Sequence, residues 1–159
     1  SSGQTEDSFA KRYVWNYYNR VPRAMRVLEA TDSWTYATAS YRQANAATGN
    51  QLDFVVGVAE VLLFAHVYAT GSADTATDFG GVGIGLDSTT AAATGNLRGD
   101  QSAVVATSRR ELTSTLVTYP PIGRHTAVWL EQGNATWTFL GDNAASGVDQ
   151  TGITGWIEG

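Results

Sequence analysis

Few side chains of this sequence are spaced for catalysis or metal binding. His66 lies inside an apolar stretch and His125 follows the turn Pro120–Gly123, and neither has metal-ligand spacing to another histidine or carboxylate. The chain has no cysteine, which excludes thiolate zinc sites, cysteine nucleophiles and disulfides. No G-x-S-x-G nucleophile elbow occurs, although a Ser/His/Asp triad built from distant positions stays open.

Two further kinds of residue could act on sugars. A pair of carboxylates could hydrolyse a glycosidic bond, and the candidates are Glu60, Glu111, Glu131 and Asp142. Nothing in the sequence ranks them above surface acids, so we expect no enzymatic activity, no cofactor and no bound metal. Exposed tryptophans could stack on a pyranose, but three of Trp34, Trp129, Trp137 and Trp156 lie in alternating strand patterns that favour the core.

The glycine-rich run "GGVGIGLDS" does not match a nucleotide-binding loop. Gly81, Gly83 and Gly85 alternate with Val82, Ile84 and Leu86, and a dinucleotide fingerprint would need its third glycine at Leu86 or Ser88. This alternation predicts a strand with one bare face, which a bulky ring or another backbone approaches closely.

The first residues differ in charge from the rest of the chain. The net charge is -5, but residues 1–26 carry five cations against two acids, which leaves residues 27–159 with a net charge of -8. The stretch "KRYVWNYYNRVPR" (residues 11–23) interleaves these cations with aromatic side chains and ends at a proline. We call residues 1–24 the leader.

Three interpretations of the leader are open. Cations and aromatics together could bind nucleic acid, but the acidic remainder would repel a long polyanion, so we expect no direct nucleic-acid contact. Tyr, Trp and Arg are enriched in protein interfaces, which favours an arm that docks on a partner or forms an oligomer. Alternatively, Val14, Tyr17 and Val21 belong to the first strand or helix of the core.

Beyond Met25 the pattern is that of a β protein. Short runs rich in Val, Thr, Tyr and Trp are separated by Gly, Asn, Asp and Ser clusters. The expected strands are Met25–Ala30, Trp34–Thr38, Asp53–Val58, Val61–Ala69, Gly81–Leu86, Ala103–Ala106, Leu112–Thr118, His125–Glu131, Thr136–Leu140 and Ile153–Ile157.

This spacing predicts an all-β fold, a jelly-roll β-sandwich of about 8–10 antiparallel strands with an N-terminal extended arm. A chain of 159 residues is long enough for one domain, so we expect an arm over residues 1–24 and a sandwich over residues 25–159. The longest apolar run, Phe54–Ala65, is interrupted by Gly57 and Glu60, which does not favour a membrane span.

One segment points to an oligomer. Residues 54–69 are apolar on both faces, with Leu62, Leu63 and Phe64 adjacent, whereas the outer face of a sandwich is normally polar. Either a subunit contact covers this strand or it is a central buried strand. For a subunit contact, the interface residues are Leu62, Phe64 and His66.

From Tyr18 onward, over about 140 residues, the chain resembles a known family. The strings "DSWTY" (32–36), "RQAN" (42–45), "GIGLDST" (83–89), "GRHTAVWLEQGNATWTFLGD" and "TGITGWIEG" are similar to the jelly-roll domain of structural proteins of tailed bacteriophages and prophages. Members of that group are head-decoration, head-fibre or tail-fibre components, usually trimeric.

The resemblance implies a non-enzymatic protein of the virion, placed on the capsid exterior. No shaft-like repeat precedes residue 25, which favours a trimeric decoration or cement protein that binds the major capsid protein directly. On this hypothesis the residues that dock on the capsid are Arg12, Trp15, Tyr17, Arg20, Arg23 and Arg26. The alternative is a receptor-binding or glycan-binding domain of a head or tail fibre.

Overall fold

The structure is a computed structural model that describes residues 6–18, 20–73, 75, 77–99, 101–102, 108–134, 137–141 and 150–159. The expected strand Ala103–Ala106 and the candidate carboxylate Asp142 lie outside the described residues. Across these described ranges, no helix is long and apolar enough to cross a membrane.

The described residues form an all-β sandwich, as the sequence predicts. Its elements are β1 (Lys11–Arg12), β2 (Pro22–Leu28), β3 (Ser33–Thr35), β4 (Arg42–Gln43), the 3₁₀ turn η1 (Ala44–Ala46), β5 (Gln51–Val56), β6 (Leu63–Ser72), β7 (Phe79–Leu86), β8 (Leu97–Arg98), β9 (Gln101–Ser102), β10 (Arg109–Thr118), β11 (Gly123–Gly133), β12 (Thr138–Leu140) and β13 (Gly152–Glu158). The nine expected strands that lie on described residues each overlap one of these elements.

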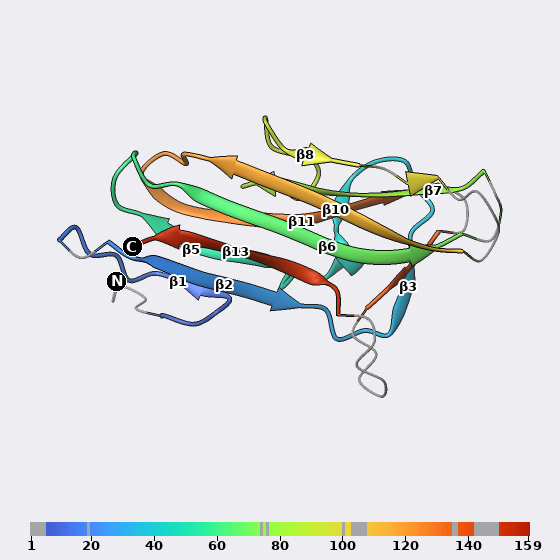
Figure 1. Cartoon of the computed structure of the whole chain (residues 1–159), viewed down its shortest axis with the longest axis horizontal. Helices are drawn as coiled ribbons and strands as arrows, with labels where there is room; N and C mark the ends of the chain where they lie inside the picture. Colours follow the sequence, from blue (N-terminus) through green and yellow to red (C-terminus); the bar gives the residue numbers. More distant parts are fainter. Residues whose placement is uncertain are drawn as a thin grey trace.

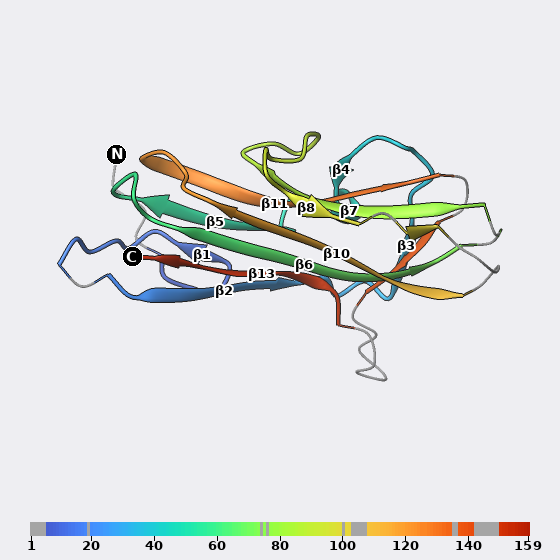
Figure 2. The same ribbon diagram turned by 45° about the horizontal axis from the view of Figure 1, so that its top comes forward.

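Two sheets pack face to face (Figures 1 and 2). The β11 sheet has the order β1-β5-β11-β7-β9, with β4 also on β11, and the β6 sheet has the order β2-β13-β6-β10-β8, with β12 on β6 and β3 on β12. Four neighbouring strands of one sheet, β2, β13, β6 and β10, interleave along the sequence with four neighbouring strands of the other, β5, β11, β7 and β9. This interleaving of two sets of four strands is the jelly-roll arrangement.

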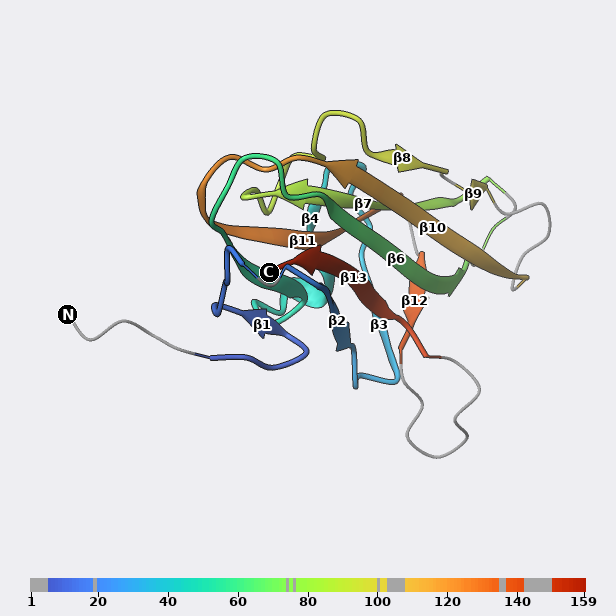
Figure 3. The same ribbon diagram turned by 60° about the vertical axis from the view of Figure 1, so that its left-hand side comes forward.

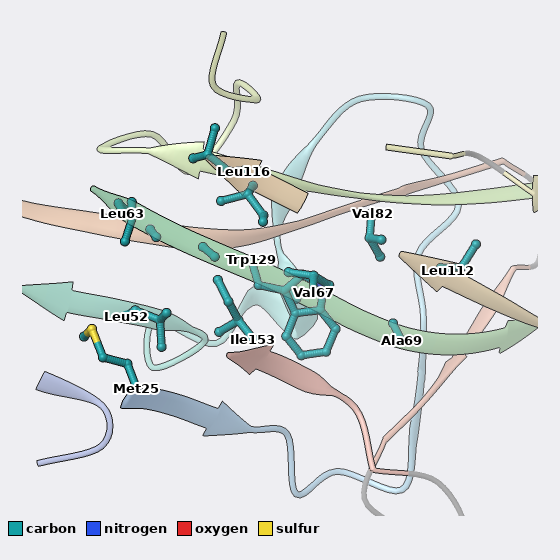
Figure 4. Packing of buried hydrophobic residues seen from close by; sticks show 14 of the residues in the cluster. Met25, Leu52, Leu63, Val67, Ala69, Val82, Leu112, Leu116, Trp129 and Ile153 are labelled. Carbon is teal, nitrogen blue, oxygen red and sulfur yellow. The ribbon is translucent and has the colours of Figure 1, made fainter. Parts of the chain in front are cut away.

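Alternation along the strands supplies the core. On β6, Leu63, Ala65, Val67 and Ala69 are fully buried, while the residues between them face outward. On the opposite sheet, Trp129 of β11 points between the layers toward β6 and β13 (Figure 4). Neighbouring side chains of a strand point to opposite faces, so one apolar residue in two is enough to build each inner face.

The glycine strand, β7, has the bare face that its sequence predicts. Val82 and Ile84 are fully buried in the core, and the ring of Tyr41 lies over Gly83 on the other face, where an added Cβ would come to 3.2 Å from a ring carbon. A Cβ at Gly85 would overlap the Ser88 carbonyl oxygen. Both a ring and a backbone segment therefore use the space that these glycines leave.

One strand boundary needs correction. β2 begins at Pro22 rather than at Met25, because residues 22–24 pair with residues 156–158 of β13. Proline is tolerated there as the first residue of an edge strand. The described strands of the sandwich pair in antiparallel fashion, while β1, in the N-terminal arm, pairs in parallel with β5, through Lys11 with Asp53 and Arg12 with Phe54.

A glycine pair makes room for the largest buried ring between the sheets. Trp137 is fully buried, and a Cβ at Gly71 of β6 or at Gly80 of β7 would overlap its indole.

We therefore expect Gly80→Ala to lower the free energy of unfolding by about 1–3 kcal/mol, as overpacking does. Urea denaturation measures this change. Gly49→Ala is the matched control because a Cβ at Gly49 meets nothing within 4 Å; equal midpoints for the two variants would contradict the prediction.

Candidate functional site

The described residues of the leader before β2, 6–18 and 20–21, do not extend away from the sandwich. Their strand β1 pairs with β5 and lies beside β2, so it joins the neighbouring edges of the two sheets (Figures 2 and 3). The Asp53 amide of β5 donates to the Ala10 carbonyl (3.0 Å), and the Arg26 amide of β2 donates to the Phe9 carbonyl (2.7 Å). The leader thus satisfies donors on both edge strands, which would otherwise face water.

A cluster of three side chains anchors the leader to the body. The Tyr13 hydroxyl donates to Asp53 Oδ2 (2.7 Å), and Arg124 binds both oxygens of the same carboxylate, at 2.9 Å from Nε to Oδ1 and 2.6 Å from Nη2 to Oδ2. Arg124 Nη2 also donates to the Tyr13 oxygen (2.8 Å). The Asp53 residue is 4% exposed, so the carboxylate depends on these donors in place of water.

The anchor shifts the pKa values of its members. Burial alone would raise the pKa of Asp53, but the hydrogen bonds from Arg124 and Tyr13 and the arginine charge outweigh it and lower that pKa below its ordinary 3.8. Burial, followed by the bond to Asp53, raises the pKa of Tyr13 to about 12. The Asp53 carboxylate and the Tyr13 phenol therefore stay in their bonding forms at neutral pH.

Trp15 provides a second attachment. Its half-buried ring lies against Gly57, where an added Cβ would overlap the indole, and a Cβ at Gly159 would come to 3.4 Å from the ring. Gly159 is itself bound, because it exchanges backbone hydrogen bonds with Val21 (3.2 and 3.4 Å) and accepts one from Arg23 Nε (2.8 Å). The leader is thus tied to the sandwich at Trp15 and again at Val21 and Arg23.

Two of the expected docking cations make ion pairs and hydrogen bonds within the protein itself. Arg12 pairs with Asp7 (2.7 Å) and donates to the Ala24 carbonyl (2.7 Å from Nη2), while Arg23 pairs with the same Asp7 (3.2 Å). Trp15 is half-buried, as described above. Arg26 is exposed, but it lies on β2, where its guanidinium is 5.8 Å from the centre of the Phe9 ring.

The other two expected docking residues meet at the leader tip, which we define as residues 17, 18 and 20. Tyr17 is 60% exposed and Tyr18 is 93% exposed, and their rings contact edge to face with centroids 5.4 Å apart. The guanidinium of Arg20 lies 6.0 Å from the Tyr17 ring centre. Sequence reasoning singled out Tyr17 and Arg20 but not Tyr18, although the adjacent tyrosines were visible in "NYYNR".

The expected oligomer residues lie on or beside β6. Phe64 and His66 face outward and are half-buried, and Leu62, also half-buried, lies just before the strand. The Phe64 ring stacks on Trp156 of β13, with ring centres 6.3 Å apart, and His66 Nδ1 lies 3.0 Å from Thr115 Oγ1. The inner face of β6 thus carries Leu63, Ala65, Val67 and Ala69, and its outer face carries the half-buried Phe64, His66 and Tyr68.

Of the remaining candidates for chemistry, one histidine has structural partners and two glutamates are exposed. His125 is buried, with Nδ1 2.6 Å from Asp87 Oδ2 and Nε2 2.8 Å from the Pro121 carbonyl. Glu60 and Glu111 are exposed. In the part of the chain that the structure describes, no group of three or more His, Asp or Glu residues could hold a metal ion.

Glu131 is the centre of a buried polar cluster that sequence reasoning missed. It is fully buried and accepts hydrogen bonds from Trp34 Nε1 (2.6 Å), Arg42 Nε (2.8 Å) and the Asn45 amide (3.1 Å). Burial raises the pKa of Glu131, although these donors and the Arg42 charge oppose the rise. Trp34, Arg42 and Asn45 belong to the strings "DSWTY" and "RQAN", so those motifs carry fold-specific contacts.

Comparisons with family models, with curated proteins and with solved structures find no match. The resemblance to phage jelly-roll proteins therefore stays a prediction from the sequence strings.

The anchor predicts a pH-dependent stability. The pKa of Asp53 is lower in the folded than in the unfolded chain. The ionised carboxylate therefore stabilises the fold in full above the unfolded pKa, and this stabilisation is lost as the pH falls through the folded pKa. We expect Asp53→Asn to lower the free energy of unfolding by about 1–2 kcal/mol at pH 7, and this deficit to shrink below about pH 4. Urea denaturation across this pH range measures both effects.

The control for this prediction is Glu60→Gln, which removes an exposed carboxylate from the β5–β6 loop. It should change stability little at any pH, because exposed charges contribute little. A deficit in Asp53→Asn that stays constant from neutral to acidic pH would contradict the proposed ion pair.

Proposed function

We propose that this protein is a non-enzymatic structural protein of a tailed-phage virion, a decoration or cement protein that binds the major capsid protein on the capsid exterior as a homotrimer. The proposal combines the sequence resemblance with the jelly-roll fold. The observation that carries it is the leader tip, where two exposed tyrosines and an arginine project from a segment that is fixed to the body.

The anchored leader suits a docking element. A free arm would lose conformational entropy when it bound a partner, whereas a leader held by Asp53, Arg124 and the slot at Gly57 is already ordered. Tyrosine and arginine are the residues that contribute most often to interface affinity. The tip can therefore insert into a groove of a capsid protein while the sandwich remains rigid.

Arg20 supplies the electrostatic part of this contact. It is exposed, and residues 27–159 carry a net charge of -8, so a cationic tip projects from an acidic body. Such a cationic tip favours an acidic or polar site on the shell, and the negative charge of the body favours an orientation in which the body faces away from that site. Salt should weaken the contact because exposed charges are screened.

The docking test uses purified capsid shells that lack this protein. We expect the wild-type protein to decorate the shells, and the double variant Tyr18→Ala/Arg20→Ala to bind about tenfold more weakly or worse. The measurement is co-sedimentation of protein with shells at low and moderate salt.

The matched control is Arg98→Ala. Arg98 is an exposed arginine of β8, outside the leader, and its guanidinium lies over the Tyr41 ring. This variant should bind shells like the wild type. If the wild type does not bind, or if the tip variant binds as tightly as the control, docking through the leader tip is ruled out.

A glycan-binding function is the second candidate, and one observation favours it. Tyr17 and Tyr18 of the leader tip and Tyr119, which follows β10 and is 64% exposed, are aromatic rings available for sugar stacking. Wild-type protein that binds host-surface glycans but no shells would establish this alternative.

A further inference from the structure

The outer face of the β6 sheet carries a continuous apolar row. Inward residues of its strands are fully buried, so the alternate residues face away from the core. The strand register places Ala24, Trp156, Phe64 and Val117 side by side across β2, β13, β6 and β10. These four strands lie next to one another across the full width of the layer in Figure 1.

The row is unusual for a surface in contact with water. Val117 is 54% exposed, and the stacked pair of Phe64 and Trp156 is half-buried with ring planes 17° apart. The solvated face of an antiparallel sheet normally carries polar residues at these positions. Aromatic residues in place of charged ones are typical of the centre of a protein interface.

The next row has little charge. It contains Arg26, Thr154, His66 and Thr115, and Leu97 of β8 continues it with 75% exposure. The nearest acids on these strands, Glu158 of β13 and Glu111 of β10, lie outside both rows, toward opposite ends of the sheet.

We propose that this face packs head-to-tail against a neighbouring surface of a second copy of this chain, as a threefold ring requires, with Trp156, Phe64 and Val117 in the contact. The inference names the subunit contact of the homotrimer in the proposed function, and in that respect it rests on that function. It extends the interface expected from Phe64 and His66 to three further strands.

The charges on this face are compatible with a second copy. The two rows carry no carboxylate, so two copies with a net charge of -5 bring no acids together at the middle of this contact. Arg26 at one edge and the acids Glu111 and Glu158 beyond the rows provide opposite charges for the rim of such a contact.

The size of the face also fits. The strands β2, β13, β6 and β10, at about 4.8 Å spacing and with about seven residues at about 3.3 Å each, give a plan area on the order of 400 Å². A stable interface buries about 800 Å² of accessible surface on each partner. An uneven face with side chains exposes more area than its plan, so the two values are of the same order.

The test is the oligomeric state of the full chain, measured by sedimentation velocity from about 1 to about 100 μM, a range that detects micromolar association. We expect the wild type to assemble. Val117→Lys places a charge in the row, next to Phe64, on a side chain already exposed in the monomer, and should weaken assembly about tenfold or more. Tyr18→Lys at the leader tip is the matched control and should assemble like the wild type.

A second variant keeps the test decisive if Val117→Lys does not fold. Thr113→Lys changes an exposed residue on the same face of β10, two positions from Thr115, and should also weaken assembly. A wild type that stays monomeric, variants that assemble like the wild type, or a Tyr18→Lys protein that dissociates would each overturn the proposal.

The same variants separate this inference from capsid docking. Tyr18→Lys that assembles but does not bind shells supports both. Shell binding by the wild type as a monomer would retain docking and overturn the self-association face. A wild type that assembles through this face but binds no shells would retain the interface and overturn the docking function.

Discussion

The ion pair between Asp53 and Arg124, closed by the Tyr13 hydroxyl, is the interaction on which the outer architecture depends. Asp53 is a buried carboxylate on an edge strand, and its two oxygens take three of the cluster's hydrogen bonds. Losing one partner would leave a buried charge without compensation, which costs more than the net value of the pair. The pair therefore keeps the leader on the sandwich, where it covers the edges β5 and β2 and fixes the direction of the leader tip.

A second buried carboxylate organises the opposite part of the fold. Glu131 collects Trp34 from β3, Arg42 from β4 and the Asn45 amide from η1, so one side chain of β11 holds the whole connection between β2 and β5. Arg42 also stacks on Tyr36, with 3.9 Å from its guanidinium carbon to the ring centre. These contacts give a structural role to Trp34, Arg42 and Asn45 in the strings that carry the resemblance, since each of them holds a segment of backbone near Glu131.

The sequence predicted the parts that local patterns determine. The runs "LFAHVYA" and "GVGIGL" predict strands, and the structure confirms them as β6 and β7. The glycine alternation of "GVGIGL" also predicts the bare face of β7, which Tyr41 covers at Gly83. The two-residue strands β1, β4, β8 and β9 have no such pattern, because they exist through pairing with distant strands. The anchor was equally invisible, since Tyr13 lies 40 residues from Asp53 and 111 from Arg124. Within the candidate site, Asp7 was the overlooked signal: an acid in a basic leader offered Arg12 and Arg23 an internal partner.

Amide exchange at the two edge strands tests the central claim, that the leader is a fixed part of the folded body. The amides of Asp53 and Arg26 donate to the carbonyls of Ala10 and Phe9. In the wild-type protein at neutral pH, residue-resolved hydrogen exchange by NMR should show both amides protected to the degree of neighbouring strand amides. Exchange of both at the rate of unprotected amides, with the rest of β5 and β2 protected, would contradict the account, because it would mean that the leader does not rest on these edges.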